Sequence, residues 1–410
     1  MARRILFITQ WFDPEPTFKG ILFAKELVSR GFSVEVITGF PNYPGGTLYD
    51  GYRVKFIQKE IIEGVLVTRV PLFPSHDKNK LGRVLNYLSF AFSSLVYCLF
   101  FSKRADVIYA YHPPFTVGIV AIILKLFRQV PVVLDIQDMW PDTLKATGMI
   151  NNARLLGFVA KVCDLIYSAV TKIVVLSPGF KDLLVDRGVP ESKIEIIYNW
   201  ADEKVLRTTN NETPEGLDRI EGFKVLFAGN VGQAQGLNVI IDAALLLKND
   251  APKLHFLVLG RGLKLEDLER RTKELNLDNV HFLPAVNMEK VGNFLGFADA
   301  LLIHLNSDPL FEITIPGKTQ AYMAVKKPII MGVRGDASNL VLRADCGVCF
   351  EPENSVALAE AAKGLMLLDQ SDIKRLGENA GKFYDKNLSV RVGVDSFEKV
   401  FNEVINRGQM

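Results

Sequence analysis

Cysteine is scarce in this chain: four of its 410 residues are cysteines. So few cysteines exclude a disulfide-stapled secreted scaffold and fit a reducing cytoplasm. The single C-x-x-C pair, Cys346 and Cys349, has no second pair and no nearby histidine to complete a zinc site. We interpret these two cysteines as small apolar side chains of a buried strand.

Several motifs of catalysis are also absent. No D-x-D pair occurs, so a carboxylate-clamped Mg²⁺ or Mn²⁺ is not indicated and no metal site is expected. The chain lacks the phosphate-binding G-x-x-x-x-G-K-S/T loop and the G-x-S-x-G nucleophile elbow. A net charge of only +2 argues against a nucleic-acid partner. The first apolar run, Ile5 to Ile8, is too short for a secretory signal, so we expect the protein to stay inside the cell.

The length, by contrast, is large. A chain of 410 residues exceeds the roughly 250–300 residues of one ordinary core, which predicts two domains of about 200 residues each. Hydrophobic residues make up 49% and charged residues 23%, a globular composition. Residues 1–200 hold 23 Lys and Arg against 17 Asp and Glu, whereas residues 201–410 hold 25 against 29. The basic first half predicts an anionic partner, such as a phosphate or a membrane surface.

Short apolar runs alternate with helical patterns along most of the chain. Because these runs are rich in Val, Ile and Leu on both faces, they are typical of parallel strands covered by helices on each side. The pattern predicts two doubly wound, Rossmann-like α/β domains, 1–200 and 223–387, that face a central cleft and are joined by a polar linker, 201–222. Ligands of such sheets bind at the carboxyl ends of the strands. The predicted strands are 4–9, 33–38, 65–70, 106–110, 130–136, 172–177, 193–198, 224–229, 253–260, 280–284, 298–305, 327–332 and 347–352, and the predicted helices include 18–30, 154–170, 236–249, 264–275, 355–368 and 372–382.

One apolar segment, 81–104, does not fit a plain soluble domain. It approaches a membrane span of ~20 residues in length, but it lies between two predicted strands of one sheet, which disfavours a full crossing. Asn86, Ser89 and Ser93 would form a narrow polar stripe on a helix. The pattern allows either a buried helix or a helix docked on a membrane surface. Docking is favoured by a second apolar helix, 115–128, and by the flanking cations Lys78, Lys80, Arg83, Lys103 and Arg104.

A glycine-rich loop opens the second domain. In FAGNVGQAQGLN, the glycines Gly229, Gly232 and Gly236 would let backbone amides approach a diphosphate at the start of a helix. The spacing differs from the G-x-G-x-x-G of dinucleotide enzymes, and no acidic ribose-binding residue can be assigned about 20 residues on. The loop therefore predicts a phosphate site without identifying the nucleotide.

Three charged side chains of the second domain could bind a nucleotide. Arg261 stands between Gly260 and Gly262 at the end of another strand, where it could donate charge-assisted hydrogen bonds to a phosphate. Lys318 follows a Pro-Gly turn at the start of a predicted helix, where anions bind well. Glu312 is a loop carboxylate that could accept hydrogen bonds from ribose hydroxyls. The alternatives are an ordinary turn for the arginine loop and solvated side chains for the other two.

Polar residues also follow two strands of the first domain. Asp135, Asp138 and Asp142 crowd the carboxyl end of one strand, where catalytic residues of α/β sheets collect. Helix N-capping is the competing explanation, and Asp142 fits it best. His112 ends the neighbouring strand and could act as a base, or it could fix the turn before two prolines.

Together these segments resemble glycosyltransferase family 4, the retaining sugar transferases of the GT-B fold. Within that family the chain is similar to the aminosugar transferases of bacterial O-antigen and capsule clusters, L-fucosamine transferases among them. The resemblance covers nearly the whole chain. Its matching segments are QWFDPEP, RGFSVEVITGFPNYPGG, DIQDMWPDT, VVLSPGFKDLLVDRGVP, YNWAD, FAGNVGQAQGL, VLGRG and IPGKTQAYMAVKKPII.

The resemblance implies a UDP-sugar donor in the second domain and no separate cofactor. The loop Gly229–Gly236, with Asn230 and Gln235, would lie around the diphosphate together with Gly260–Gly262 and Lys318. Amides, a helix end and the lysine would stabilise the charge that develops on the diphosphate as it leaves. An acceptor hydroxyl would enter from the same face of the sugar.

The chain departs from the family pattern in its donor loops. Asn230, Gln233 and Gln235 occupy the first loop, where the family usually has an Arg and a Lys. Of two family glutamates, Glu312 replaces the first with a shift of one residue, and Ala321 stands at the second. The remaining cations of these loops are therefore expected to carry more of the diphosphate binding.

The resemblance further implies that the first domain binds the acceptor. We expect an undecaprenyl-diphosphate-linked sugar at the inner face of the cytoplasmic membrane, and a protein bound peripherally there. The histidine common at the first domain's strand end corresponds to Gln137, which leaves Asp138 as the carboxylate. The final helix, 388–410, is expected to cross back onto the first domain.

Two other functions fit the same residues. A sugar-nucleotide epimerase of the same fold would need no lipid. A non-catalytic scaffold of a polysaccharide-assembly complex would explain the missing Glu, Arg and Lys. A Rossmann dehydrogenase is disfavoured because its glycine fingerprint is absent.

Overall fold

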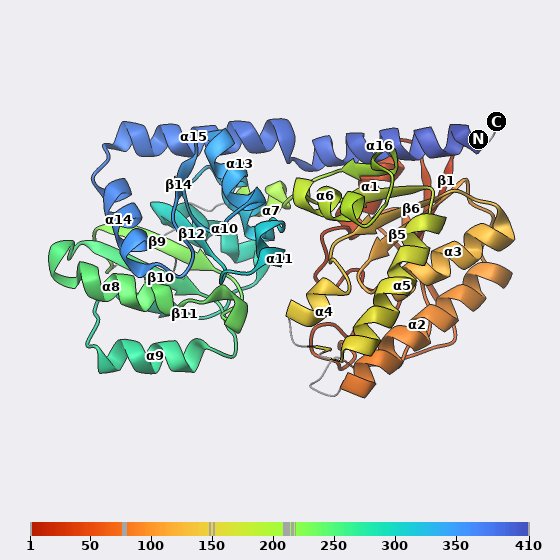
Figure 1. The fold of residues 1–410 in the computed structure, drawn as a ribbon, viewed down its shortest axis with the longest axis horizontal. Helices are drawn as coiled ribbons and strands as arrows, with labels where there is room; N and C mark the ends of the chain where they lie inside the picture. Colours follow the sequence, from red (N-terminus) through yellow and green to blue (C-terminus); the bar gives the residue numbers. More distant parts are fainter. Residues whose placement is uncertain are drawn as a thin grey trace. The chain divides into compact units, whose positions relative to one another are not determined.

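The structure is a computed structural model that describes residues 2–75, 80–146, 149–150, 152–207, 214, 217 and 219–408. The chain divides into two compact units, each with its own sheet (Figure 1). The first unit combines Met1–Tyr198 with Gly393–Met410, and the second is Asn199–Val392. The segment 201–222, predicted as a linker, belongs to the second unit and contains α7 (Glu203–Arg207).

The first unit is built on an eight-stranded sheet that is parallel except at one edge. Strands buried on both faces explain its apolar runs, and the strand order reverses beside the first strand of the chain. In order across the sheet, the strands are β3 (Gln58–Ile62), β4 (Val65–Arg69), β2 (Ser33–Thr38), β1 (Arg4–Thr9), β5 (Val107–His112), β6 (Val132–Ile136), β7 (Lys172–Val175) and β8 (Ile194–Ile196).

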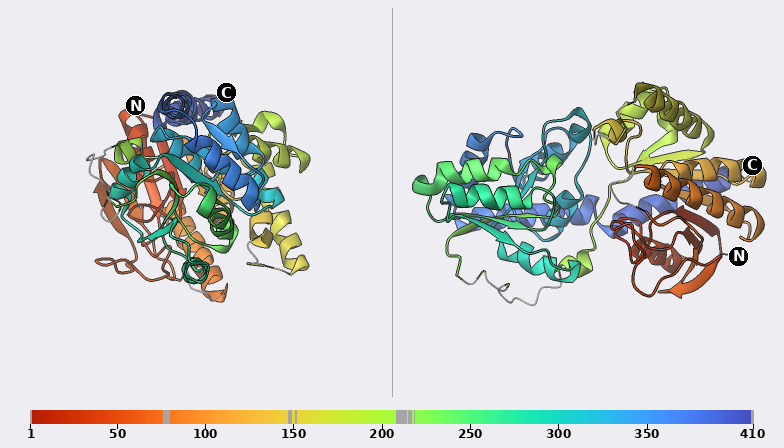
Figure 2. Two further views of the ribbon diagram at one scale, coloured as in Figure 1. Left: turned by 90° about the vertical axis from the view of Figure 1, so that its left-hand side faces the viewer. Right: turned by 90° about the horizontal axis from the view of Figure 1, so that it is seen from below.

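Helices cover both faces of this sheet (Figure 2). The C-terminal helix packs on the first unit: the Phe397 ring centroid lies 4.9 Å from that of Phe23, and Asp395 pairs with Arg30 at 2.6 Å. The helices of this unit are α1 (Ile21–Ser29), α2 (Lys80–Phe100), α3 (Thr116–Arg128), α4 (Asp142–Ala146), α5 (Ala153–Ala169), α6 (Pro178–Asp186) and α16 (Val390–Arg407).

The sequence pattern did not predict the edge strand β3. It pairs antiparallel with β4 through a turn at Glu63 and Gly64, whose φ angles are 45° and 83°. Its residues alternate between half-buried and exposed, so it lacks the apolar run by which the other strands were recognised. A charged strand of this kind protects a sheet edge from pairing with another chain.

The second unit is a six-stranded, wholly parallel sheet. Its strand order reverses between its first and fourth strands, which is the doubly wound arrangement. The prediction of two α/β domains on largely parallel sheets is thus confirmed. In order across the sheet, the strands are β11 (Val280–Leu283), β10 (Leu254–Leu259), β9 (Phe223–Ala228), β12 (Ala300–His304), β13 (Ile329–Gly332) and β14 (Gly347–Cys349).

Helices of the second unit also pack on both faces of its sheet (Figure 1). Four of them, α7, α10, α11 and α13, were not predicted, and the predicted helix 372–382 is part of a longer one. Besides α7, they are α8 (Asn238–Asp250), α9 (Leu265–Glu274), α10 (Met288–Phe297), α11 (Pro309–Glu312), α12 (Gly317–Ala324), α13 (Asp336–Ala344), α14 (Ser355–Met366) and α15 (Gln370–Asn387).

Candidate functional site

A cavity of about 440 Å³ opens at the carboxyl end of the second sheet. Its walls come from the ends of β9 and β10, the first turns of α12, and α10 with the loop before it. This is the side of the sheet on which doubly wound folds bind their ligands. The lining residues are Leu206, Ala228, Gly229, Asn230, Leu259, Gly260, Arg261, Ala285, Val286, Met288, Val291, Leu295, Gly317, Lys318, Ala321 and Tyr322.

Lys318 is the cation most enclosed in this cavity. Its Nζ lies 3.9 Å from the centroid of the Phe227 ring, and burial lowers its pKa to about 7. A Cβ on Gly229 would come within 2.5 Å of the lysine Cε, at a backbone φ of 140°, so glycine here lets the lysine side chain keep its position. Within the described part of the chain no carboxylate pairs with Nζ. A bound anion would restore the full charge of this ammonium.

Arg261 supplies the second cation of the cavity. Its side chain is exposed and has no ion-pair partner among the described residues. The described lining contains no Asp or Glu, and Ala321, where the resemblance placed a second glutamate, lines the cavity without a carboxylate. Two cations without a counter-charge give the cavity an electrostatic preference for an anion.

The opposite wall is apolar and was missed by sequence reasoning. It consists of Ala285 and Val286 in the loop after β11, and of Met288, Val291 and Leu295 on α10. An apolar wall beside two cations suits a ligand with an anionic part and an apolar part. The position of the loop could have predicted this wall. The loop follows β11, which runs parallel to β10, so both strands end at the same edge of the sheet.

The glycines after β10, Gly260 and Gly262, allow the loop after β10 to pack closely against the loop after β9. A Cβ on Gly260 would lie 1.9 Å from the carbonyl oxygen of Gly229, and one on Gly262 would lie 2.2 Å from that of Val231. The amide of Val231 donates to the carbonyl of Arg261 at 2.9 Å. Gly260 lines the cavity, whereas Gly262 only permits the close approach of the backbones.

Gly232, Gln235 and Gly236 lie outside the cavity lining. The amide of Gly232 donates to Oε1 of Gln235 at 3.1 Å, and Nδ2 of Asn230 donates to the same oxygen at 3.3 Å, so the glutamine closes the loop on itself. Gly236 has a φ of 54°, and a Cβ there would meet Oδ1 of Asn306 at 1.9 Å. The described contacts of these three residues stabilise the turn.

Glu312 also lies outside the cavity lining. It ends α11, is 42% exposed, and its carboxylate is 3.7 Å from Nη1 of Arg334. The structure therefore shows a surface ion pair at the position where ribose binding was predicted.

A second group of polar side chains gathers at the carboxyl ends of β5 and β6 in the first unit. Burial raises the pKa of Asp138 to about 6, so this carboxylate is largely ionised at pH 7 and close to its titration point. His112 ends β5, is 2% exposed, and burial lowers its pKa to about 3. Its Nδ1 has no hydrogen-bond partner among the described residues. The Trp140 ring lies 6.0 Å from the imidazole.

The other two aspartates of this strand end have structural partners. Asp135 is fully buried and accepts a hydrogen bond from the Tyr109 hydroxyl at 2.6 Å, close to the buried Lys19. Asp142 is the first residue of α4 and pairs with Arg187. Asp138 is therefore the carboxylate of this strand end that remains available for a ligand.

The helix α2 joins this group through Asn86. Nδ2 of Asn86 donates to Oδ1 of Asn42, in the loop after β2, at 3.2 Å, and Oδ1 of Asn86 accepts from Gln10, which follows β1. Tyr87 lies beside Trp140, with ring centroids 6.4 Å apart. The N-terminal half of α2 therefore forms part of the polar site of the first unit.

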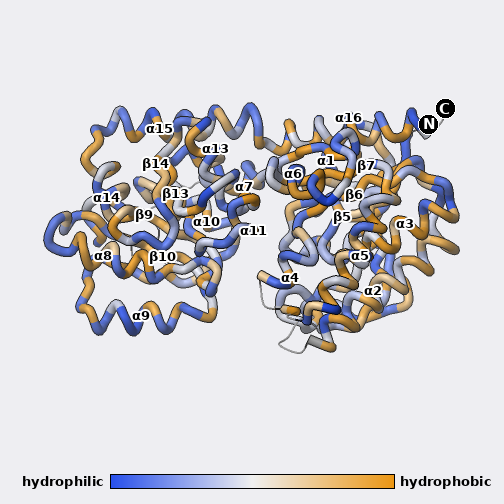
Figure 3. Tube along the Cα trace, in the orientation of Figure 1, coloured by the Kyte–Doolittle hydropathy of each residue, from blue (hydrophilic) through white to orange (hydrophobic). Residues whose placement is uncertain are grey.

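The polar stripe of α2 faces the protein. Ser89 Oγ accepts a hydrogen bond from the amide of Phe73 at 2.8 Å, and Ser93 donates to the carbonyl of Pro71. The apolar face of the helix is exposed instead, and Figure 3 shows hydrophobic residues along α2 and α3. Among the described residues, Leu81–Phe100 is the one helix long and apolar enough to cross a membrane. The exposed apolar side chains of this helix are Leu81, Val84, Leu85, Leu88, Phe92 and Phe100.

The two cysteines of the C-x-x-C pair lie at the edge strand of the second sheet. Cys346 is buried before β14 and Cys349 half-buried within it, and neither forms a disulfide. The described residues contain no group of three or more His, Cys, Asp or Glu side chains that could hold a metal ion.

Two family models together span most of the chain. Residues 22–200 match the glycosyl transferase 4-like domain, and residues 211–383 match the glycosyl transferases group 1. WbjE of Pseudomonas aeruginosa, named as a glycosyltransferase, is 24% identical over 82% of this chain and 85% of its own. WcaI of Escherichia coli, a glycosyl transferase assigned to colanic acid biosynthesis, is 25% identical over 83% of this chain and 86% of its own.

Solved structures share the fold. HepE of Anabaena, crystallised with UDP, superimposes with a TM-score of 0.73 at 15% identity, covering 98% of this chain and 100% of its own. Sucrose-phosphate synthase of Thermosynechococcus elongatus gives a TM-score of 0.74 at 15% identity, covering 99% and 100%. The first unit thus matches a glycosyl transferase 4-like domain and the second the glycosyl transferases group 1, and the protein belongs to the glycosyltransferases, on the two-domain GT-B fold.

Proposed function

We propose that the second unit binds a UDP-sugar, with the diphosphate beside Lys318 and Arg261. The observation that carries the proposal is the cavity itself, which combines two unpaired cations with a described lining free of carboxylates. Its apolar wall at Val286 and Met288 would take the uracil ring. The HepE structures with UDP and with UDP-glucose support this choice of nucleotide.

The proposed reaction is transfer with retention and without a metal. The bond between the anomeric carbon and the diphosphate oxygen breaks, and its electron pair leaves with UDP. An acceptor hydroxyl forms the new bond on the same face and passes its proton to the departing diphosphate. Lys318 and Arg261 stabilise the negative charge that develops there. Asp138 orients the acceptor hydroxyl, and the neutral His112 provides a buried polar contact beside it.

The proposed acceptor is an undecaprenyl-diphosphate-linked sugar at the inner face of the cytoplasmic membrane. The exposed apolar face of α2 and the basic residues Lys103 and Arg104 after it suit an anionic lipid surface. The resemblance to aminosugar transferases suggests N-acetylfucosamine, or a related N-acetylated aminosugar, as the sugar transferred to an O-antigen or capsule glycan. The protein would thus act as a peripheral membrane enzyme.

The test is thermal unfolding with UDP, GDP, ADP and dTDP, each with and without a chelator. A nucleotide at ~100 times its dissociation constant adds ~2.7 kcal/mol of stability, a readily measured shift. We expect a shift that is selective for UDP and insensitive to the chelator. A shift abolished by the chelator would overturn metal independence, and no shift with any nucleotide would favour the non-catalytic scaffold. Turnover of a UDP-sugar without any lipid would favour the epimerase.

A further inference from the structure

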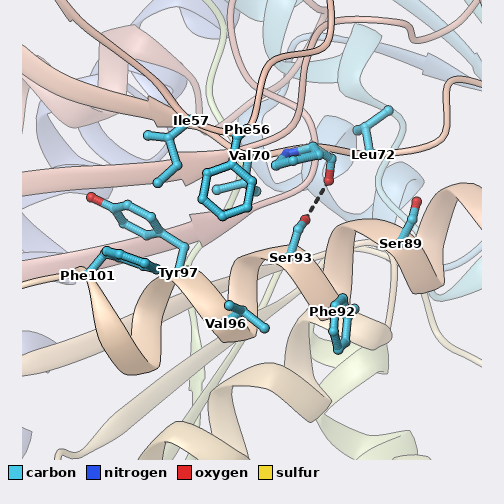
Figure 4. Close-up of a pocket in the computed structure, with 11 residues that line it drawn as sticks. Phe56, Ile57, Val70, Leu72, Ser89, Phe92, Ser93, Val96, Tyr97 and Phe101 are labelled. Carbon is cyan, nitrogen blue, oxygen red and sulfur yellow. Dashed lines mark hydrogen bonds between the residues drawn. The ribbon is translucent and has the colours of Figure 1, made fainter.

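A groove of about 290 Å³ runs along one side of α2, outside the polar site of the first unit (Figure 4). One wall is a face of α2, and the other is the chain before β3 together with the residues that follow β4. In Figure 4 the rings of Phe56 and Tyr97 lie between these two walls. The lining is apolar except for the two serines, and its residues are Phe56, Ile57, Val70, Pro71, Leu72, Ser89, Phe92, Ser93, Val96, Tyr97 and Phe101.

The rim of the groove is aromatic and open to solvent. Phe56 is 72% exposed and Phe92 is 70% exposed. Leaving two such rings in water is unfavourable, because full burial of a Phe side chain is worth ~1.5–3 kcal/mol. The polar groups of Ser89 and Ser93 are already satisfied by the backbone at Phe73 and Pro71. A ligand in the groove would therefore make apolar contacts and would not need to form hydrogen bonds there.

The helix α2 connects this groove to the polar site. From Phe101 back to Ser89 the groove follows the helix for ~18 Å, at 1.5 Å per residue. One turn further lies Asn86, which bonds Asn42 of the polar site. Tyr87 follows it, and the charges of Arg83 and Asp138 both act on its hydroxyl. A long ligand with its tail in the groove would therefore present its head near Asp138.

The charges along α2 suit an anionic head group. No Asp or Glu occurs between Leu81 and Ala105. Nε of Arg83 is buried and has no hydrogen-bond partner among the described residues. An arginine in this position is a donor for phosphate oxygens.

We propose that this groove holds the polyisoprenoid chain of the lipid-linked acceptor, with the diphosphate at Arg83 and the sugar toward Asp138. The inference rests on the proposed function and deepens it, because it names the part of the enzyme that recognises the lipid. The groove follows the face of α2 that continues to Asn86 of the polar site, so one lipid-linked sugar can place its chain in the groove and its sugar at that site. The exposed outer face of α2 is left to contact the bilayer.

The test uses a farnesyl diphosphate analogue that carries a diazirine at the end of its isoprenoid chain. After photolysis of the full-length protein, peptide mass spectrometry should place the label on Phe56–Ile57 or Phe92–Phe101. An excess of geranylgeranyl diphosphate should suppress the labelling, whereas phosphatidylglycerol at the same concentration should not. Equal competition by phosphatidylglycerol would assign the groove to a bilayer lipid and overturn the proposal.

Two variants obstruct the groove from opposite walls. Val96→Trp and Ile57→Trp should each lower labelling by about tenfold, the loss expected when ~1.4 kcal/mol of contact is removed. Val84→Trp places the same side chain on the exposed face of α2 and should leave labelling unchanged. Undiminished labelling in both groove variants would refute the assignment. UDP-induced stabilisation of wild type and variants is measured alongside: its absence would defeat the proposed function while leaving the groove result intact.

Discussion

The ammonium of Lys318 lies 3.9 Å from the centroid of the Phe227 ring, at the back of the cavity of the second unit. The ring attracts the cation weakly, but burial costs it enough solvation to lower its pKa to about 7. The protein thus holds a cation where an anion can bind it. Burial of this unpaired ammonium lowers the stability of the nucleotide-free protein.

Lys318→Met should weaken UDP binding by about 10- to 100-fold, since a charge-assisted hydrogen bond contributes ~1.5–3 kcal/mol. The melting temperature of the nucleotide-free variant should stay the same or rise, because an unpaired buried cation has been removed. Isothermal titration calorimetry and thermal unfolding measure the two effects. Lys264→Met, at a lysine 45% exposed, is the matched control and should bind UDP normally.

Binding of UDP should take up a proton at pH 8. With a pKa of about 7, Lys318 is mostly neutral there in the free enzyme, and a diphosphate beside it raises the pKa so that it becomes charged. At pH 6 the lysine is already charged and the uptake should vanish. Calorimetry in two buffers of different ionisation enthalpy measures the uptake. If no proton were taken up at either pH, the diphosphate would not bind beside Lys318.

Asp138→Asn should lower turnover strongly and raise stability above pH 6. The folded protein holds the proton of Asp138 more tightly than the unfolded chain does, because burial raises its pKa to about 6. Stability is therefore lost as pH rises from about 4 to 6, and the asparagine variant avoids this loss, worth up to about 3 kcal/mol. Thermal unfolding at pH 5 and pH 8 gives the difference. Wild-type turnover in the variant would remove Asp138 from the mechanism.

Gly260→Ala should destabilise the second unit even without nucleotide. The new Cβ would lie 1.9 Å from the carbonyl oxygen of Gly229, at a backbone φ of 150°. A loss of about 2 kcal/mol or more is expected from the forced separation of the two loops. Gly364→Ala on α14 is the control, since nothing lies within 4 Å of its Cβ, and there alanine should stabilise by about 0.5–1 kcal/mol. Thermal or urea unfolding distinguishes the two.

Leu85→Ser combined with Leu88→Ser should weaken binding to vesicles that contain phosphatidylglycerol by at least about tenfold, because each leucine side chain loses ~1.5–3 kcal/mol of burial. Both side chains are more than half exposed, at 53% and 54%, so the fold should not change. Leu263→Ser, in the second unit and 89% exposed, is the control. Vesicle co-sedimentation measures the binding. Equal retention of the double variant and the control would argue against α2 as the docking surface.

Much of the fold could be predicted because parallel strands buried on both faces leave an uninterrupted apolar signal. The strands β1, β5 and β9 were recognised in this way, each within two residues of its ends. The edge strand β3 escaped because its half-exposed, charged sequence carries no such run.

The site was predicted less evenly. Gly229, Asn230, Gly260, Arg261 and Lys318 do line one cavity. The other residues predicted to bind the UDP-sugar, Gly232, Gln235, Gly236, Gly262 and Glu312, lie outside its lining. Glycine and polar side chains occur both in tight turns and in phosphate-binding loops, so the sequence alone does not separate the two roles. The apolar wall on α10 left no motif at all, since the contribution of Met288 and Val291 is only their shape and position.

By itself, the amino-acid sequence determined the local structure: where strands and helices form, which loops need glycine, and that α2 is apolar enough to meet lipid. Those properties depend on each residue's own backbone freedom and burial free energy. Only the tertiary structure decided which way each side chain faces. It turned the polar stripe of α2 toward Asn42 and the backbone at Phe73, and it brought Lys318 to Phe227 from 91 residues away. Such contacts depend on sheet order and helix packing, which no local pattern encodes.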